Sequence, residues 1–137
     1  MEYTFKNWQQ NDIYNCDVEF NRIEVYNQYV ENWLKTYYNM NSLNLQHKTN
    51  WTINDIPDLD DFNRIKRNIN RLIPILDGGS LLNISLATNY LLSVSEVNEI
   101  EEALKRNLQE LGNMQFSYNV TGLAITSNNN LKLGGVN

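Results

Sequence analysis

One stretch of this chain is written twice. Residues 54–65 read NDIPDLDDFNRI and residues 11–23 read NDIYNCDVEFNRI, with one extra residue between the shared NDI and FNRI. Trp51 and Trp8 stand at the same place before each copy, and Val97-Asn98-Glu99-Ile100 marks a weaker third copy. The three copies cover about residues 8–38, 51–76 and 89–111. A unit repeated in this way predicts a fold built by packing similar elements against one another.

Each copy carries a signal for the start of a helix. Ser93 and Glu96 have the spacing of a capping box, in which each side chain accepts a hydrogen bond from the main-chain N–H of the other. In the second copy Asp58 stands at the cap position and precedes further acids, which favour the positive end of a helix. Ile56 is held extended by Pro57. The unit is therefore predicted to be a short extended segment, a cap and a helix.

Apolar residues recur at intervals of three and four after each cap. They are Ile23, Tyr26, Val30, Trp33 and Tyr37 in the first copy, Phe62, Ile65, Ile69 and Leu72 in the second, and Val97, Ile100, Leu104, Leu108 and Leu111 in the third. This spacing is typical of helices packed side by side at shallow angles. We therefore expect a mainly α domain over residues 1–111, with three helices in a small bundle. Pro74 is expected to end or kink the second helix, and Gly112 to end the third.

The pattern changes after Gly112. Met114, Phe116, Tyr118 and Val120 alternate with polar residues, which is the period of a half-buried strand. Turn-forming residues separate this run from two further short apolar runs. Residues 112–137 are therefore predicted to be a short β-rich, hairpin-like tail that pairs with another copy or another protein, since a lone ribbon is marginal in water. The residues expected to contact that partner strand are Phe116, Tyr118, Val120, Leu123 and Ile125.

The repeated asparagine and the distribution of charge leave two questions open. Asn21, Asn63 and Asn98 each follow the large apolar residue at a helix start. Their amides either tie the first turn of one unit to the backbone of a neighbouring unit or face solvent in an asparagine-rich chain. The second helix is basic and the other two are acidic, so ion pairs can form within one chain or between chains and set the choice of partner.

No catalytic chemistry is evident in the sequence. His47 is the one histidine and lies in the polar stretch LQHKTN, so we expect it on the surface; Cys16, the one cysteine, is expected to be a small buried apolar residue. We predict no enzyme, no catalytic or metal-binding residues and no cofactor. The net charge of −5 disfavours nucleic acid, although Arg64, Arg67 and Arg71 leave that alternative open. No apolar run is long enough for a membrane span.

The second copy carries a resemblance to a known family. Its sequence WTINDIPDLDDFNRIKRNI resembles a segment of tail-associated structural proteins of phages and prophages of Firmicutes, in which the pattern is close to W-T-x-x-D-I-P-x-x-x-D-F-N-R-I-x-x-N-I. The stretch VNEIEEALKRNLQEL resembles a second motif that often follows it. Lys66 departs from the pattern, because an acidic residue is usual there. The resemblance covers about residues 50–111.

The resemblance implies a virion structural protein without enzyme activity, made in the bacterial host cytoplasm and located in the phage particle. It would be a homo-oligomeric component of the tail, neck or fibre attachment, and its partners would be copies of itself and other tail, neck or fibre proteins. The residues assigned to the repeat interface are Trp51, Asp55, Ile56, Pro57, Phe62, Asn63, Ile65, Asn21 and Asn98. The alternative is a carbohydrate-binding module at the tail tip that recognises the host cell wall through the aromatic residues of the first helix.

Overall fold

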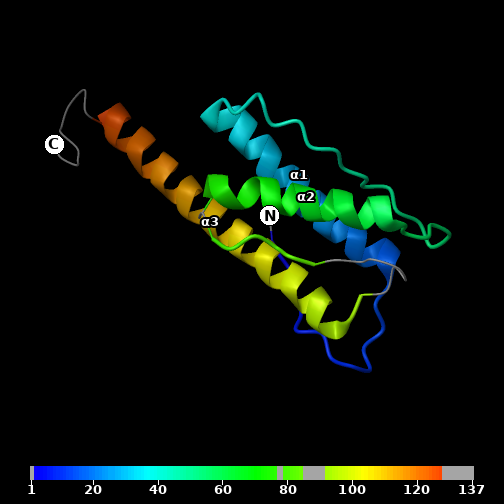
Figure 1. Cartoon of the computed structure of the whole chain (residues 1–137). Helices are drawn as coiled ribbons and strands as arrows, with labels where there is room; N and C mark the ends of the chain where they lie inside the picture. The colour runs from blue at the N-terminus through cyan, green and yellow to red at the C-terminus, as the bar shows by residue number, and fades with distance from the viewer. Residues whose placement is uncertain (1, 77–78, 85–91, 128–137) are drawn as a thin grey trace.

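Three helices pack around one core in the computed structural model, which describes residues 2–76, 79–84 and 92–127. The helices are α1 (Cys16–Tyr38), α2 (Leu59–Leu76) and α3 (Val94–Ser127), and each contacts the other two (Figure 1). An extended segment precedes each of the first two helices. We call residues 2–15 strap 1 and residues 43–58 strap 2. The prediction of a mainly helical bundle of three helices is confirmed.

The helix starts follow the local signals. At α2, the N–H of Asp58 donates to Asp61 Oδ2 at 3.0 Å and the N–H of Asp61 donates to Asp58 Oδ1 at 2.9 Å. At α3, Ser93 and Glu96 exchange the equivalent bonds at 2.8 and 3.1 Å. Both pairs are capping boxes, which satisfy main-chain donors that a helix leaves without partners.

The first helix ends at a residue that tolerates a left-handed backbone. Asn39 has φ 54° and ψ 33°, and its N–H bonds to the carbonyl of Leu34. Asparagine adopts this conformation more readily than most side chains, so it stops α1 where glycine would otherwise be needed.

The core is built from the predicted apolar stripes. The side chains of Ile23, Leu34, Ile69, Leu72 and Leu104 are almost completely buried between the helices. Burial of each such side chain contributes about 1.5–3 kcal/mol. Leu82 and Ile84, which follow α2, close the same core.

The prediction that Gly112 ends the third helix is wrong, because α3 continues through this residue to Ser127. Pro74 was expected to end or kink the second helix, and it does not end it, because α2 continues through Pro74 to Leu76. The β-rich tail is not confirmed, because the structure places residues 112–127 in a helix; residues 128–137 lie outside the described part. The helical residues include all five that were expected to contact a partner strand, namely Phe116, Tyr118, Val120, Leu123 and Ile125. No helix in the described ranges is both long and apolar enough to cross a membrane.

Gly112 provides a test of the continuous third helix. A Cβ added at this residue meets no atom within 4 Å. Gly112→Ala should therefore stabilise the chain by about 0.5–1 kcal/mol, because alanine is the better helix former. Urea denaturation measures the change. If residue 112 instead ended the helix with a positive φ, alanine would destabilise the chain.

Candidate assembly surfaces

The repeated asparagines hold the straps. Asn21 on α1 donates from Nδ2 to the carbonyl of Trp51 at 2.9 Å and accepts the Trp51 N–H on Oδ1 at 2.8 Å. Asn98 on α3 makes the same pair of bonds with Trp8, at 3.0 and 2.8 Å. α1 thus binds strap 2, and α3 binds strap 1. For these two residues, the interpretation that the amide ties one unit to its neighbour is correct.

Each strap also carries the same arrangement of a lysine, a tryptophan and an aspartate. In strap 1, Lys6 Nζ lies 4.4 Å from the centre of the Trp8 ring and 3.4 Å from Asp12 Oδ2. Asp12 also accepts the N–H of Gln9 at 2.7 Å, and this hydrogen bond holds the pKa of Asp12 below its usual value. The aspartate thereby closes a turn immediately after the tryptophan.

Strap 2 repeats the arrangement. Lys48 Nζ lies 4.5 Å from the centre of the Trp51 ring and 3.5 Å from Asp55 Oδ2. Asp55 accepts the N–H of Thr52 at 2.8 Å, which lowers its pKa in the same way. Both tryptophan side chains are buried, so the straps belong to the core.

A buried glutamate connects α1, strap 2 and α2. Glu24 is fully buried and accepts Arg64 Nη2 at 2.7 Å, the Trp51 indole N–H at 2.6 Å and the Lys48 N–H at 2.9 Å. Burial of a carboxylate is costly unless every oxygen finds donors, as it does here. The residue three positions after Asn21 therefore stabilises the interface between two repeat units.

The corresponding glutamate of α3 makes a similar contact. Glu101, three residues after Asn98, pairs with Arg22 of α1. Arg22 also bonds Glu19 at 3.0 Å and the carbonyl of Thr4 at 2.9 Å, which fixes strap 1. The corresponding residue of α2 is Lys66, whose Nζ donates to the carbonyl of Ile84 at 2.8 Å.

The prediction that His47 lies on the surface is wrong. Its side chain is 6% exposed and Nε2 lies 2.7 Å from Glu31 Oε1. Glu31, also buried, accepts the N–H of Leu45 at 2.9 Å and lies 3.2 Å from Lys35 Nζ. Burial alone raises the pKa of Glu31, but these donors outweigh it and the pKa is lowered. Cys16 is half-buried, and burial raises its thiol pKa.

The remaining repeat residues divide into buried and exposed ones. Ile65 is buried, and the Phe62 ring lies 5.4 Å from that of Phe20. Ile56, before Pro57, is 88% exposed. Asn63 is exposed, and its amide has no hydrogen-bond partner among the described residues. Within the described residues, two of the three repeated asparagines, Asn21 and Asn98, therefore bind the main chain of a strap. We call each of these pairs of hydrogen bonds an asparagine clamp.

The second half of α3 projects beyond the other two helices (Figure 1). Phe116 is 70% exposed and Val120 is 48% exposed, and the two lie on one face because they are four residues apart. Residues 112–127 contain no charged side chain.

Tyr118 lies on the opposite side of the same helix and packs on an aromatic cluster. Its ring centre is 5.8 Å from Trp33, 5.3 Å from Tyr37 and 6.2 Å from Tyr38. Gln115 adds a hydrogen bond to the Tyr29 hydroxyl at 3.0 Å. The aromatic residues of α1 therefore hold the base of the projecting segment.

Sequence reasoning missed the buried polar residues of α1. Glu24, Asn27 and Glu31 are all nearly fully buried. The signal for their burial was present in the sequence, because a spacing of three and four residues places all three on one face of the helix. Within the described ranges, no group of three or more His, Cys, Asp or Glu residues is arranged to hold a metal ion.

Comparisons with family models, curated proteins and solved structures give no match to this chain.

The asparagine clamp gives a matched pair of variants. Asn21→Ala removes two hydrogen bonds and leaves the Trp51 main-chain groups without partners, so it should lower the free energy of unfolding by about 2 kcal/mol. Asn54→Ala alters an exposed asparagine of the same strap and should change it by less than about 0.5 kcal/mol. Urea denaturation compares the two. Equal losses would contradict a structural role for the Asn21 amide.

Proposed function

We propose that this protein is a homo-oligomeric structural component of a bacteriophage virion, in the tail, neck or fibre attachment, and acts by protein–protein assembly. The observation that carries the proposal is the projecting half of α3, which presents Phe116 and Val120 to solvent. Exposed apolar side chains gathered on one face are typical of interaction sites. The resemblance of residues 50–111 to phage tail-associated proteins supports the same function.

The absence of charged side chains from residues 112–127 favours a second copy of the same chain as the partner. The chain carries a net charge of −5, so two copies repel each other over most of their surface. Residues 112–127 contain no charged side chain, and two such helices can approach without like-charge contacts. The projecting helix thus takes the assembly role that the sequence pattern assigned to a β-rich tail.

Native mass measurement tests self-assembly. The wild-type chain should have a mass of two or more times 16.1 kDa, and Phe116→Glu combined with Val120→Glu should shift it to the monomer. Two carboxylates placed in an apolar interface oppose association by repulsion and by the cost of desolvation. Ser117→Glu adds one charge at the edge of the same face and serves as a milder control.

Two results would contradict the proposal. One is a wild-type chain that stays monomeric at 16.1 kDa at all accessible concentrations. The other is the absence of this chain from purified particles of the phage or prophage that encodes it.

The aromatic cluster favours a second function, a carbohydrate-binding module that recognises the host cell wall. Tyr37 and Tyr38 are 47% and 39% exposed beside Trp33. Stacking on exposed rings is a common mode of sugar binding, and host cell-wall polysaccharide would then protect Trp33 fluorescence from quenching. Trp51 is buried and does not report on such binding.

A further inference from the structure

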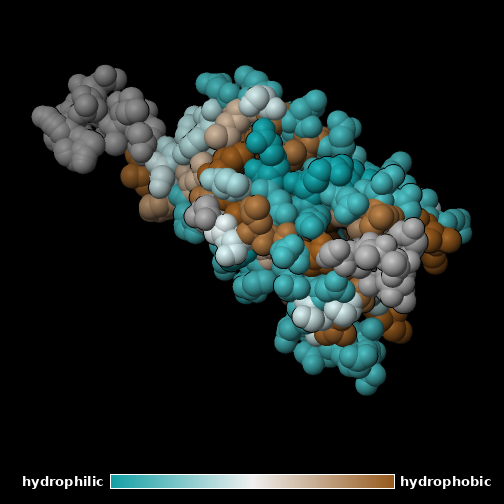
Figure 2. All heavy atoms as spheres, viewed as in Figure 1, coloured by the Kyte–Doolittle hydropathy of each residue, from teal (hydrophilic) through white to brown (hydrophobic). Residues whose placement is uncertain are grey.

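The exposed side of α2 forms a basic groove in an acidic protein. The groove has a volume of about 560 Å³ and lies between α2 and residues 44–46 of strap 2. Four of its lining residues are cationic and none is acidic; the cations are Arg64, Lys66, Arg67 and Arg71. Figure 2 shows this side of the bundle as hydrophilic. A groove of one charge sign attracts a ligand of the opposite sign.

The four cations are not equally available. Arg64 binds Glu24 and Asp61 at 2.7 Å each, and Lys66 donates to the carbonyl of Ile84. Arg67 and Arg71 are exposed and have no carboxylate partner among the described residues. Two guanidinium groups one helical turn apart therefore favour a ligand that carries carboxylates.

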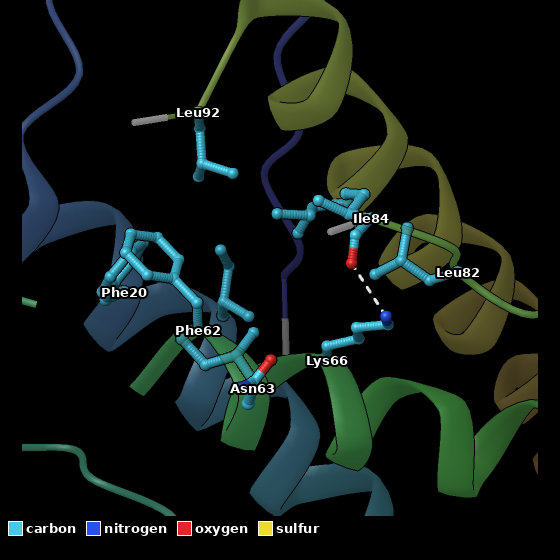
Figure 3. Close-up of a pocket in the computed structure, with 10 residues that line it drawn as sticks. Phe20, Phe62, Asn63, Lys66, Leu82, Ile84 and Leu92 are labelled. Carbon is cyan, nitrogen blue, oxygen red and sulfur yellow. Dashed lines mark hydrogen bonds between the residues drawn. The ribbon is translucent and has the colours of Figure 1, made fainter. Parts of the chain in front are cut away.

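Asn63 joins this groove to a small apolar pocket. It lines both, and the pocket, of about 20 Å³, is also lined by Phe20, Phe62, Leu82 and Leu92 (Figure 3). Asn21 and Asn98, at the same position of the repeat, each bind the N–H and carbonyl of one extended residue. Asn63 thus carries the same side-chain amide at the third of these positions, and it has no hydrogen-bond partner among the described residues.

We propose that the groove on α2 is a docking site for an extended, acidic peptide segment of another protein. Asn63 hydrogen-bonds the N–H and carbonyl of one residue of this segment, as Asn21 does with Trp51. Acidic side chains of the segment pair with Arg67 and Arg71, and the end of an apolar side chain enters the pocket beside Phe62. The inference does not depend on self-assembly through α3.

The main-chain clamp favours a peptide over nucleic acid. An asparagine amide that offers one donor and one acceptor matches the carbonyl and N–H of a single extended residue, and the chain shows this match twice. A phosphate backbone supplies acceptors alone and would leave the Asn63 carbonyl oxygen unused. The net charge of −5 also opposes binding to a polyanion.

A peptide from this chain is a suitable probe. Residues 49–61, TNWTINDIPDLDD, carry four aspartates and contain the segment that Asn21 clamps. The fluorescein-labelled peptide should bind the full chain with saturable anisotropy, and added salt should weaken the binding. Asn63→Ala, and separately Arg67→Glu combined with Arg71→Glu, should each weaken it about tenfold or more. Asn113→Ala and Lys105→Glu on α3 should leave the affinity unchanged.

Four results would overturn the inference. They are no binding at peptide concentrations up to about 1 mM; equal binding of a scrambled peptide of the same composition; equal binding to Asn63→Ala; and tighter binding of a single-stranded DNA 20-mer, lost in the arginine variant alone. If Asn63→Ala destabilises the chain as much as Asn21→Ala and no peptide binds, the Asn63 amide serves the fold and not a ligand. That outcome also counts against a partner.

Discussion

The fold depends on one type of interaction, in which an asparagine side-chain amide hydrogen-bonds the main chain of an extended segment in place of a neighbouring strand. The straps have no strand partner in the described chain, so the main-chain groups around Trp8 and Trp51 need hydrogen bonds from elsewhere. An asparagine in the first turns of a neighbouring helix supplies both, and the tryptophan side chains can then enter the core. Without the clamp, each strap would lose its register on the helix, and the core would lose two of its largest side chains.

The clamps also explain how a repeated sequence gives one compact bundle instead of an open array. The first unit holds the strap of the second, and the third holds the strap of the first, so the contacts run around the bundle. Glu24 and Glu101 reinforce the two interfaces with arginine partners from the next unit. The second unit differs at this position, because Lys66 replaces the glutamate and Asn63 is exposed. The basic side of α2 faces solvent, with Arg67 and Arg71 exposed.

The sequence predicted the helices well, since they follow from apolar spacing and capping boxes. The recurring asparagine indicated the clamps only as one of two alternatives, and Asn63 follows the other, because it is exposed. It did not predict the length of α3. Met114, Phe116, Tyr118 and Val120 alternate as in a strand, yet apolar side chains on two opposite sides of a helix give the same alternation over so short a run. Here Tyr118 packs on α1 while Phe116 and Val120 face outward. The pairing of Glu31 with His47 was also hidden, because it joins residues sixteen apart that meet only after strap 2 folds back along α1.

Amide hydrogen exchange followed by NMR tests the central claim most directly. If the asparagines hold the straps, the N–H groups of Trp8 and Trp51 should exchange almost as slowly as that of Val30 in the middle of α1, through near-global unfolding. If these two amides exchange as fast as that of exposed Gln10, the straps are not clamped and the account fails.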